Sequence, residues 1–386
     1  MPTNERANKL REKKRQKDRK TKIIIWSVLG LIILTIVIMK ICEIDFADVK
    51  NKISANTTIS TVADGYPYSL DISGKADVEV VNDKLAVLTD TSLSVIDPSN
   101  AKKIDSFDHG YSNPIMTTAG NYTCIYDRGT TRLRVDTANR SVYEKNTKRN
   151  IICASIASNG TVAYAVFSDD ADCELIVMSR LEKVKMSLPI KDGYITRLAI
   201  NSSGTKCVYV TVSTVDAAVV STVHTINVGD AQDSATATYE SSNILDVTYS
   251  TANDAYIIGD DFLSIASSKE FKDVFQKGSV NVNNYCFTKN RELVLNYKDY
   301  SNSAESDIAY IKSNGNVKSK TTVSEEVLYL SSSGNSITVL VPDKINIYSL
   351  NKCELNRSEE CDSSVNSVHT LGSKSYVQYG QYIDVL

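Results

Sequence analysis

Residues 336–348 read SITVLVPDKINIY, and this stretch decides the fold of the chain. Apolar and polar residues alternate in its two halves, which is typical of half-buried antiparallel strands. Pro342-Asp343-Lys344 separates the halves as a turn, where the missing N–H of proline costs nothing. The stretch therefore predicts a β-hairpin with one face toward a core.

The same layout recurs along most of the chain. Residues 85–96 repeat it, with a turn at Asp90 and a second turn that contains Pro98. The turn after the first apolar run appears about every 40 residues, at Asn82-Asp83, Gly120-Asn121, Asn159-Gly160, Ser203-Gly204, Asn253-Asp254, Lys289-Asn290, Ser333-Gly334 and Gly372-Ser373. This period, with about four short strands per unit, predicts an all-β fold, a β-propeller of sheets set around an axis. A row of sandwich domains would need linkers and a period nearer about one hundred residues, and the chain has neither.

The number of blades depends on how the two ends of the repeat meet. The last unit provides only three strands, at 365–370, 375–379 and 382–386. The stretch 66–72 precedes the first full unit and has no partner there. We expect it to supply the outer strand of the last blade and to close the ring, which removes open sheet edges. This arrangement favours eight blades, with seven as the alternative.

Residues 195–206 form an apolar run that leads into a Ser-Ser-Gly-Thr-Lys turn. This segment resembles a strand and turn of WD40-like, TolB-like and quinoprotein-type propellers. The only Trp lies at position 26, so the Trp-Asp signature is absent, as are the kelch glycine pair and the sialidase Asp-box. The whole layout resembles the domain-of-unknown-function 5711 family of membrane-anchored proteins from Gram-positive bacteria. That resemblance implies a propeller on a membrane anchor, and it brings no assigned activity.

The first 42 residues predict how the chain meets a membrane. Residues 23–39 contain seven Ile, three Leu and two Val and no charge. These twelve side chains favour insertion by about 5 kcal/mol, and the apolar run at ~1.5 Å per residue spans about 28 Å. We therefore predict a transmembrane signal anchor at 23–42, formed chiefly by Ile23, Ile24, Ile25, Trp26, Leu29, Leu31, Ile32, Ile33, Leu34, Ile36, Val37 and Ile38.

A basic arm at 1–22 predicts the orientation of this span. The positive-inside rule places the arm in the cytoplasm, against anionic lipid headgroups, and the rest of the chain outside the cell. The residues assigned to this role are Lys13, Lys14, Arg15, Lys17, Arg19, Lys20 and Lys22. A cleavable signal peptide is the alternative, but Met39 to Glu43 contain no small-residue cleavage site. A buried core helix would alternate polar and apolar faces, and this span does not.

After the anchor, 43–60 is expected to be a polar tether and 61–386 the extracytoplasmic propeller. The portion beyond the arm and Lys40 carries 32 Lys and Arg against 43 Asp and Glu. Such an acidic balance keeps an exposed domain soluble and argues against nucleic acid as its ligand.

The cysteines and histidines show no ligand or catalytic spacing. Eight Cys occur without CxxC pairs, and those in strand-like runs, Cys124, Cys153, Cys207 and Cys286, are expected in the core. A disulfide between Cys353 and Cys361 is left open. Each of His109, His224 and His369 stands without a second ligand nearby, and a catalytic triad would require partners from distant blades. We expect these histidines to be solvated or core residues.

Acids and tyrosines in predicted loops complete the search for chemistry. Asp169, Asp170 and Asp172, and also Asp260 and Asp261, are expected to cap turns through their own backbone, because the calcium-loop spacing is missing. Tyr111, Tyr194 and Tyr300 lie in predicted loops, where a tyrosine surface for binding is the alternative to packing between blades. No phosphate-binding glycine loop or dinucleotide fingerprint is present.

These observations predict a non-enzymatic, membrane-tethered propeller that binds or scaffolds an envelope protein, peptide or glycan, without a cofactor or metal. The alternative is an extracytoplasmic hydrolase or lyase of propeller type, whose carboxylates or histidines would meet at the axis. A sensor that signals through the span is less favoured, because the cytoplasmic arm is too short for a signalling domain.

Overall fold

The computed structural model describes residues 65–70, 76–230, 232–267, 269–300 and 302–386. The chain divides into two compact units, 1–59 and 60–386, and the described residues belong to the second unit. The predicted arm at 1–22, span at 23–42 and tether at 43–60 lie outside the described residues. Within the described ranges, no helix has the length and apolar character needed to cross a bilayer.

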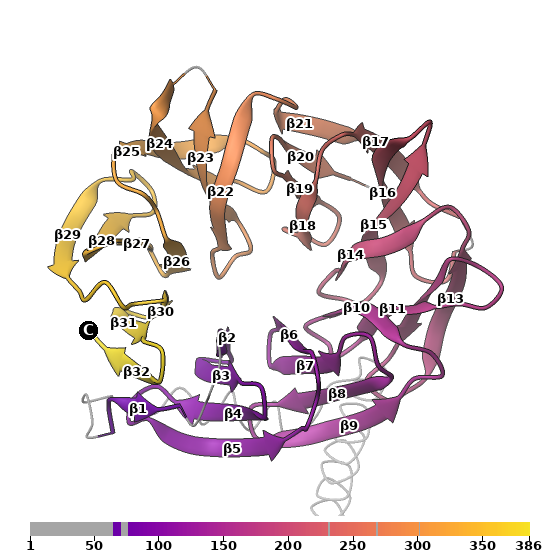
Figure 1. Ribbon diagram of the computed structural model, residues 1–386, viewed down its shortest axis with the longest axis horizontal. Helices are drawn as coiled ribbons and strands as arrows, with labels where there is room; N and C mark the ends of the chain where they lie inside the picture. The colour runs from indigo at the N-terminus through magenta and orange to yellow at the C-terminus, as the bar shows by residue number, and fades with distance from the viewer. Residues whose placement is uncertain (1–64, 71–75, 231, 268, 301) are drawn as a thin grey trace, which may run out of the picture. The chain divides into compact units, whose positions relative to one another are not determined.

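The described residues form eight four-stranded antiparallel sheets that stand side by side in a ring (Figure 1). We call each sheet a blade and give its strands from the innermost to the outermost. Blade 1 contains β2 (Asp77–Val81), β3 (Lys84–Leu88), β4 (Ser92–Asp97) and β5 (Lys102–Asp108), and blade 2 contains β6 (Pro114–Ala119), β7 (Tyr122–Asp127), β8 (Arg132–Thr137) and β9 (Arg140–Asn146). Blade 3 contains β10 (Ile151–Ile156), β11 (Val162–Phe167), β12 (Cys173–Met178) and β13 (Val184–Ile190), and blade 4 contains β14 (Tyr194–Ile200), β15 (Lys206–Val215), β16 (Ala218–Asn227) and β17 (Ala235–Glu240).

Blades 5 to 8 follow the same order around the ring. Blade 5 contains β18 (Ile244–Tyr249), β19 (Ala255–Gly259), β20 (Leu263–Ala266) and β21 (Phe271–Phe275), and blade 6 contains β22 (Val280–Phe287), β23 (Leu293–Asp299), β24 (Asn302–Ile311) and β25 (Val317–Val323). Blade 7 contains β26 (Tyr329–Ser333), β27 (Ser336–Val341), β28 (Lys344–Ser349) and β29 (Leu355–Glu360), and blade 8 contains β30 (Ser367–Leu371), β31 (Lys374–Gln378), β32 (Tyr382–Val385) and β1 (Tyr68–Ser69).

The predicted all-β propeller with eight blades is confirmed, and the alternative of seven blades is wrong. Each of the eight turns found in the sequence joins the first and second strands of one blade, from 82–83 between β2 and β3 to 372–373 between β30 and β31. The turns tolerate this geometry because their residues adopt positive φ, as Asn82 at 50° and Gly204 at 67° do.

Burial follows the position of a strand within its blade. The second strands are nearly continuous in buried residues, as in β19, whereas outer strands such as β17 alternate between half-buried and exposed residues. One apolar cluster lies at each junction between neighbouring blades. The cluster between blades 2 and 3 is an example, since it joins Tyr122 and Cys124 to Ile156 and Tyr164. The core is therefore a ring of apolar layers between sheets.

Blade 8 is built from both ends of the described chain. Its outermost strand β1 pairs with β32 through Tyr68 opposite Ile383 and Ser69 opposite Tyr382. This is the position expected for 66–72, of which 71–72 lie outside the described residues. The N–H of Leu70 donates to Gln381 O at 2.8 Å. We call the contact region between blade 8, which includes β1, and blade 1 the seam.

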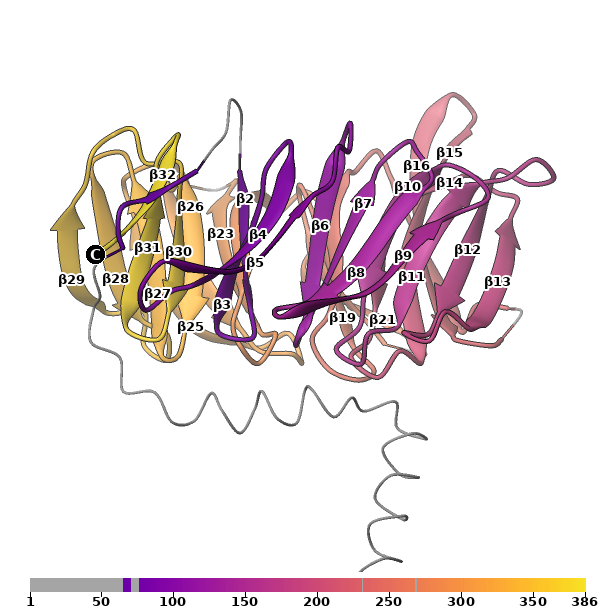
Figure 2. The same cartoon turned by 90° about the horizontal axis from the view of Figure 1, so that it is seen from below.

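The antiparallel order gives the ring two distinct ends (Figure 2). We call one end the near end; it is the end that holds the connections between first and second strands and between third and fourth strands. Gly65 lies at this end, because a Cβ at this residue would be 2.2 Å from the backbone O of Asn100, which follows β4. We call the opposite end the far end; it holds the connections between second and third strands and those between blades.

Candidate functional site

Seven of the eight innermost strands (Figure 1) carry ionisable residues, and these are the candidates for axial chemistry. They are Asp77 and Glu79 on β2, Cys153 on β10, Tyr194 and Arg197 on β14, Asp246 and Tyr249 on β18, Tyr285 and Cys286 on β22, Tyr329 on β26 and His369 on β30. The innermost strands of neighbouring blades also pack against one another, as β10, β14 and β18 do. The innermost strands are therefore more polar than strands made only of aliphatic, Ser and Thr residues would be.

Arg197, Asp246 and Tyr285 connect blades 4, 5 and 6. Arg197 Nε donates to the carbonyl of Leu245 at 2.6 Å, and its Nη1 donates to Thr196 O at 2.9 Å. Burial raises the pKa of Asp246 to about 6, although the N–H of Val247, the Arg197 charge and the Tyr285 hydroxyl all favour its ionised form. These groups are engaged in joining blades.

Glu79 is the most unusual carboxylate on the axis. Its residue is exposed to solvent, yet burial, and next the nearby Asp77 carboxylate, raise its pKa to about 7. Exposure and a raised pKa occur together when a carboxyl touches water but is surrounded by protein, because the surrounding protein limits how well water solvates its charge. Burial, followed by the charges of Glu79 and Asp77, also raises the pKa of the Tyr329 phenol in blade 7. A carboxylate that titrates near neutral pH is suited to general acid–base chemistry.

His369 belongs to a chain of hydrogen bonds that reaches across the seam. Ser367 Oγ donates to Gln378 Oε1 at 2.8 Å, so it accepts from His369 Nε2, also at 2.8 Å. Gln378 Nε2 then donates to Ala76 O of blade 1 at 3.0 Å. Burial lowers the pKa of His369 to about 4, so the ring is neutral at physiological pH and acts as a core residue, as expected.

Blade 4 contains a hydroxyl, an imidazole and a carboxylate in the order of a catalytic triad. His224 Nδ1 donates to Asp233 Oδ2 at 2.8 Å, and Nε2 of His224 lies 2.9 Å from Thr211 Oγ1. Tyr209 stacks on the His224 ring at 4.6 Å and donates to Asp233 Oδ1 at 2.8 Å. Thr211 is only 2% exposed, so its hydroxyl is closed to a substrate and the group stabilises the blade. The expectation that His224 could meet such partners only from distant blades is wrong, because one blade supplies all of them.

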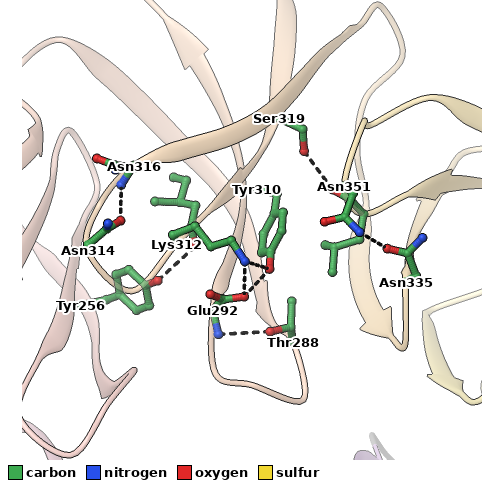
Figure 3. A network of polar contacts seen from close by, with 12 residues as sticks. Tyr256, Thr288, Glu292, Tyr310, Lys312, Asn314, Asn316, Ser319, Asn335 and Asn351 are labelled. Atoms are coloured by element: carbon green, nitrogen blue, oxygen red, sulfur yellow. Dashed lines mark hydrogen bonds and ion pairs between the residues drawn. The ribbon is translucent and has the colours of Figure 1, made fainter.

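A second polar network ties together turns at the near end of blades 5, 6 and 7 (Figure 3). Lys312 Nζ donates to Glu292 Oε2 at 3.2 Å and to Tyr310 Oη at 2.9 Å, and the Tyr310 hydroxyl donates to Glu292. Tyr256 Oη donates to Ile311 O at 3.0 Å. Each residue labelled in Figure 3 makes at least one hydrogen bond to another protein group, so we interpret this network as structural.

The remaining sequence candidates are placed in loops or in the core. His109 is buried, with its Nε2 at 3.2 Å from Thr89 O, and burial lowers its pKa. Asp172 accepts from the Gly193 N–H at 2.8 Å and Asp260 from the Asn243 N–H at 3.1 Å, so these two acids bond to a neighbouring connection and not, as expected, to the backbone of their own turn. In the described part of the chain, no group of three or more His, Cys, Asp or Glu residues could hold a metal ion.

The cysteines described by the structure are free thiols, and Cys353 and Cys361 do not pair. Cys124 and Cys207 are fully buried, where burial raises the pKa of the Cys207 thiol to about 12. Cys42 lies outside the described residues. Tyr111 is half-buried beneath Arg132, whose guanidinium carbon lies 4.7 Å from the ring centre, so this tyrosine packs between blades.

The two ends of the ring differ in charge. This difference concerns the exposed charged residues of the connections and of the strand residues that adjoin them. The near end balances six acids against six cations, namely Asp83, Glu182, Asp230, Asp233, Glu270 and Glu354 against Lys102, Arg140, Lys183, Lys269, Lys289 and Lys352. The far end has thirteen described acids against four cations, namely Asp77, Asp90, Asp108, Asp169, Asp170, Asp192, Asp216, Glu240, Asp299, Glu326, Asp343, Glu360 and Asp362 against Arg128, Lys148, Lys191 and Lys277.

Exposed apolar side chains share the far end with these acids. Tyr194 is 48% exposed and lies against Phe167, 45% exposed, with the ring centres 6.0 Å apart. Tyr300 at the β23–β24 turn is 61% exposed. Sequence reasoning singled out Tyr194 and Tyr300 but missed the valines of the β15–β16 hairpin, because a Val-rich strand looks the same whether or not a neighbour covers it.

Comparison with known proteins gives a family but no activity. A model described as a family of unknown function, DUF5711, matches residues 68–382. One similar solved structure is the crystal structure of the Myceliophteria thermophila Cps50 (Swd1) beta-propeller domain, with a TM-score of 0.49 and 11% sequence identity over 83% of this chain and 98% of that chain. No curated protein matches the chain.

Proposed function

This chain belongs to the family of unknown function DUF5711, and from that premise we propose that it is a non-enzymatic binding or scaffolding module. The span at 23–42 holds the propeller at the cell membrane as a single-pass protein, with residues 1–22 in the cytoplasm. The propeller stands outside the cell and binds an envelope protein, peptide or glycan.

One observation carries the binding role: at the far end of the ring exposed acids outnumber exposed cations, whereas the two signs balance at the near end. Of the charged groups on the inner strands, Arg197 is engaged by the backbone of blade 5. The far end combines exposed acids with exposed aromatic rings. Contiguous exposed apolar groups with a polar surround are typical of interaction sites.

Cross-linking of the full chain in its native membrane tests the binding role. A photo-reactive amino acid replaces Tyr300 at the far end and, as a matched control, Leu355 at the near end, which is 55% exposed. We expect Tyr300 to yield discrete cross-linked products that mass spectrometry identifies as envelope components, and Leu355 to yield none. Absence of such products from both positions would contradict a binding role.

Protease treatment of intact cells tests the topology. We expect the propeller to be digested while an epitope tag at residue 1 survives, because the positive-inside rule places only the arm in the cytoplasm. Protection of the propeller in intact cells, with digestion only after lysis, would overturn this part of the proposal.

A second function, hydrolysis or elimination at the axis, is favoured by Glu79 alone. With its pKa raised to about 7, this carboxyl could give up or take a proton near neutral pH. The test is a panel of glycan and peptide substrates with the wild-type chain, Glu79→Gln and the control Asp246→Asn. Activity lost in Glu79→Gln by about 100-fold or more, and kept in Asp246→Asn, would favour the enzyme over the binding module.

A further inference from the structure

The β15–β16 hairpin extends beyond the sheet to which it belongs, and Figure 2 shows it projecting at the far end. Its strands pair along their whole length, up to Val215 opposite Ala218. The neighbouring strand β14 stops pairing at Tyr194 opposite Val212, and β17 stops at Glu240 opposite Val220. Residues 213–219 therefore form a two-stranded ribbon, and no further strand pairs with it in the described part of the chain.

The ribbon carries large apolar side chains that nothing covers. Val215 is 53% exposed and Val219 is 57% exposed. At the foot of the ribbon lies Tyr194, the first residue of β14, in contact with Phe167 of blade 3. The edge of β15 continues past Tyr194. Gly193 still lies against Val212 and Ser213, whereas no strand of the described chain pairs with this edge at Thr214 and Val215. An exposed strand edge beside apolar side chains is a template for pairing with another chain.

The charge around the ribbon indicates what kind of chain would fit. Asp192 precedes Tyr194, Asp216 forms the ribbon tip and Glu240 ends the adjacent strand, and all three are exposed. Lys191 is the one exposed cation among the described residues of blade 4 and its connections at the far end. Across the far end, exposed acids outnumber exposed cations by about three to one. A polyanion would be repelled by this surface, while a cationic segment would be attracted.

We propose that the β15–β16 ribbon is a docking edge for an extended, Lys- or Arg-rich protein segment with alternating apolar residues. The segment adds as a strand along Thr214 and Val215 and places its apolar side chains on the face of the ribbon that carries Tyr194 and Val219. Its cations lie near Asp192 and Asp216. The inference deepens the proposed function and rests on it, because it names the end of the ring and the class of partner.

The test uses the full chain in detergent and a fluorescein-labelled peptide of alternating Lys and Val. We expect saturable binding by fluorescence anisotropy that weakens in high salt, and no binding of a matched Glu-Val peptide. A Lys-Val peptide methylated on alternate backbone nitrogens cannot pair as a strand, and we expect it to lose binding. Equal binding of the methylated peptide, or of the Glu-Val peptide, would overturn the proposal.

Paired variants place the contact on the ribbon. Val215→Ser with Val219→Ser removes the exposed valine from each of the two faces of the ribbon, and we expect about tenfold weaker binding. The matched control is Leu181→Ser with Val184→Ser at the near end, where the residues are 66% and 52% exposed, and it should change affinity less than about twofold. For charge, Asp192→Asn with Asp216→Asn should weaken binding at low salt, whereas Asp83→Asn with Glu182→Gln should not. Equal losses in the variants and their controls would overturn the ribbon as the site.

Thermal unfolding of each variant verifies that the ring remains folded. Failure of this inference is distinguishable from failure of the proposed function. If cross-linking finds an envelope partner at far-end positions other than the ribbon, and ribbon variants bind as wild type, then the binding role holds and the docking edge is wrong.

Discussion

Blade 4 and blade 8 have the same number of strands, but different interactions hold them together. In blade 4, β15 and β16 pair over ten residues each, and backbone hydrogen bonds form a complete ladder. In blade 8, β1 contributes two paired residues to β32. Side chains compensate there, since Tyr66 and Tyr376 both donate to Pro98 O, at 3.1 and 3.0 Å. The comparison teaches that a propeller blade can be completed by a few side-chain contacts to its neighbour when the strand itself is short.

The largest expected effect tests whether the seam depends on a neutral His369. The folded protein keeps this ring neutral down to its pKa of about 4, while the unfolded chain takes up a proton near the ordinary histidine pKa of 6.5. Between these values the unfolded state binds more protons, so acidification favours unfolding, by up to about 3 kcal/mol. We expect wild type to lose this stability between about pH 6.5 and 4, and His369→Gln to lose that much less.

Denaturant titrations at several pH values measure this difference. The curve of His369→Gln is subtracted from that of wild type because other groups also titrate in this range. Glu79, Asp246 and Asp136 have raised pKa values of about 7, 6 and 6. Their folded forms bind more protons than the unfolded chain, so they contribute stability that is lost as pH rises. Parallel pH curves for wild type and His369→Gln would contradict the role given to His369.

The next effect tests how tightly the chain enters the seam. A Cβ at Gly65 would lie 2.2 Å from the backbone O of Asn100, and this backbone atom cannot move without displacing the β4–β5 turn. We expect Gly65→Ala to lower the free energy of unfolding by about 2 kcal/mol. The matched control is Gly380→Ala in the same blade, where a Cβ would meet nothing within 4 Å. If both variants unfold alike, Gly65 is not a tight point of the seam.

A double-mutant cycle at Pro98 O tests whether hydrogen bonds at the seam are coupled to one another and independent of blade 4. Tyr66→Phe or Tyr376→Phe alone leaves one donor on this carbonyl, so each should cost about 0.5 to 1 kcal/mol. Together they leave the carbonyl without these donors, and we expect about 0.5 kcal/mol of extra loss. Tyr209→Phe in blade 4, which removes the contact with Asp233, should add to Tyr376→Phe without coupling. Coupling between the two distant blades would show that they do not act independently.

The smallest effect concerns the tip of the blade 4 ribbon. Ala217 adopts a φ of 66°, a conformation that disfavours side chains with a Cβ. We expect Ala217→Gly to raise the free energy of unfolding by about 0.5 kcal/mol. Ala218→Gly, in the strand beside it, should instead lower stability by a similar amount, because glycine loses more freedom in a strand. Thermal unfolding measures both changes. Opposite signs for the two Ala→Gly variants would show that the backbone conformation at the tip, and not the added glycine itself, sets the change in stability.

The sequence was sufficient to predict the blades because turns leave a local signal. Asn82 and Asp83 both take positive φ, and such residues at a fixed spacing mark where each inner hairpin reverses. The seam was also foreseen, since 66–72 was a strand without a partner. The His224 group was missed because it depends on the pairing of Tyr209 with His224 and on a connection that returns Asp233 to the same face. Likewise, the exposure of Val215 depends on where β14 ends, which no residue of β15 reveals.

The seam also constrains how the protein is made. Ala76 and Gln378 are separated by 302 positions in the chain, and Pro98 and Tyr376 by 278. During translation, the first strand therefore leaves the ribosome long before its partner exists. It must remain unpaired until β32 is synthesised, and contacts of such high sequence separation form slowly. Premature termination before β32 thus leaves the upstream blades present but the ring open. A quality-control protease could therefore distinguish such chains from those that contain β32 by the state of the seam.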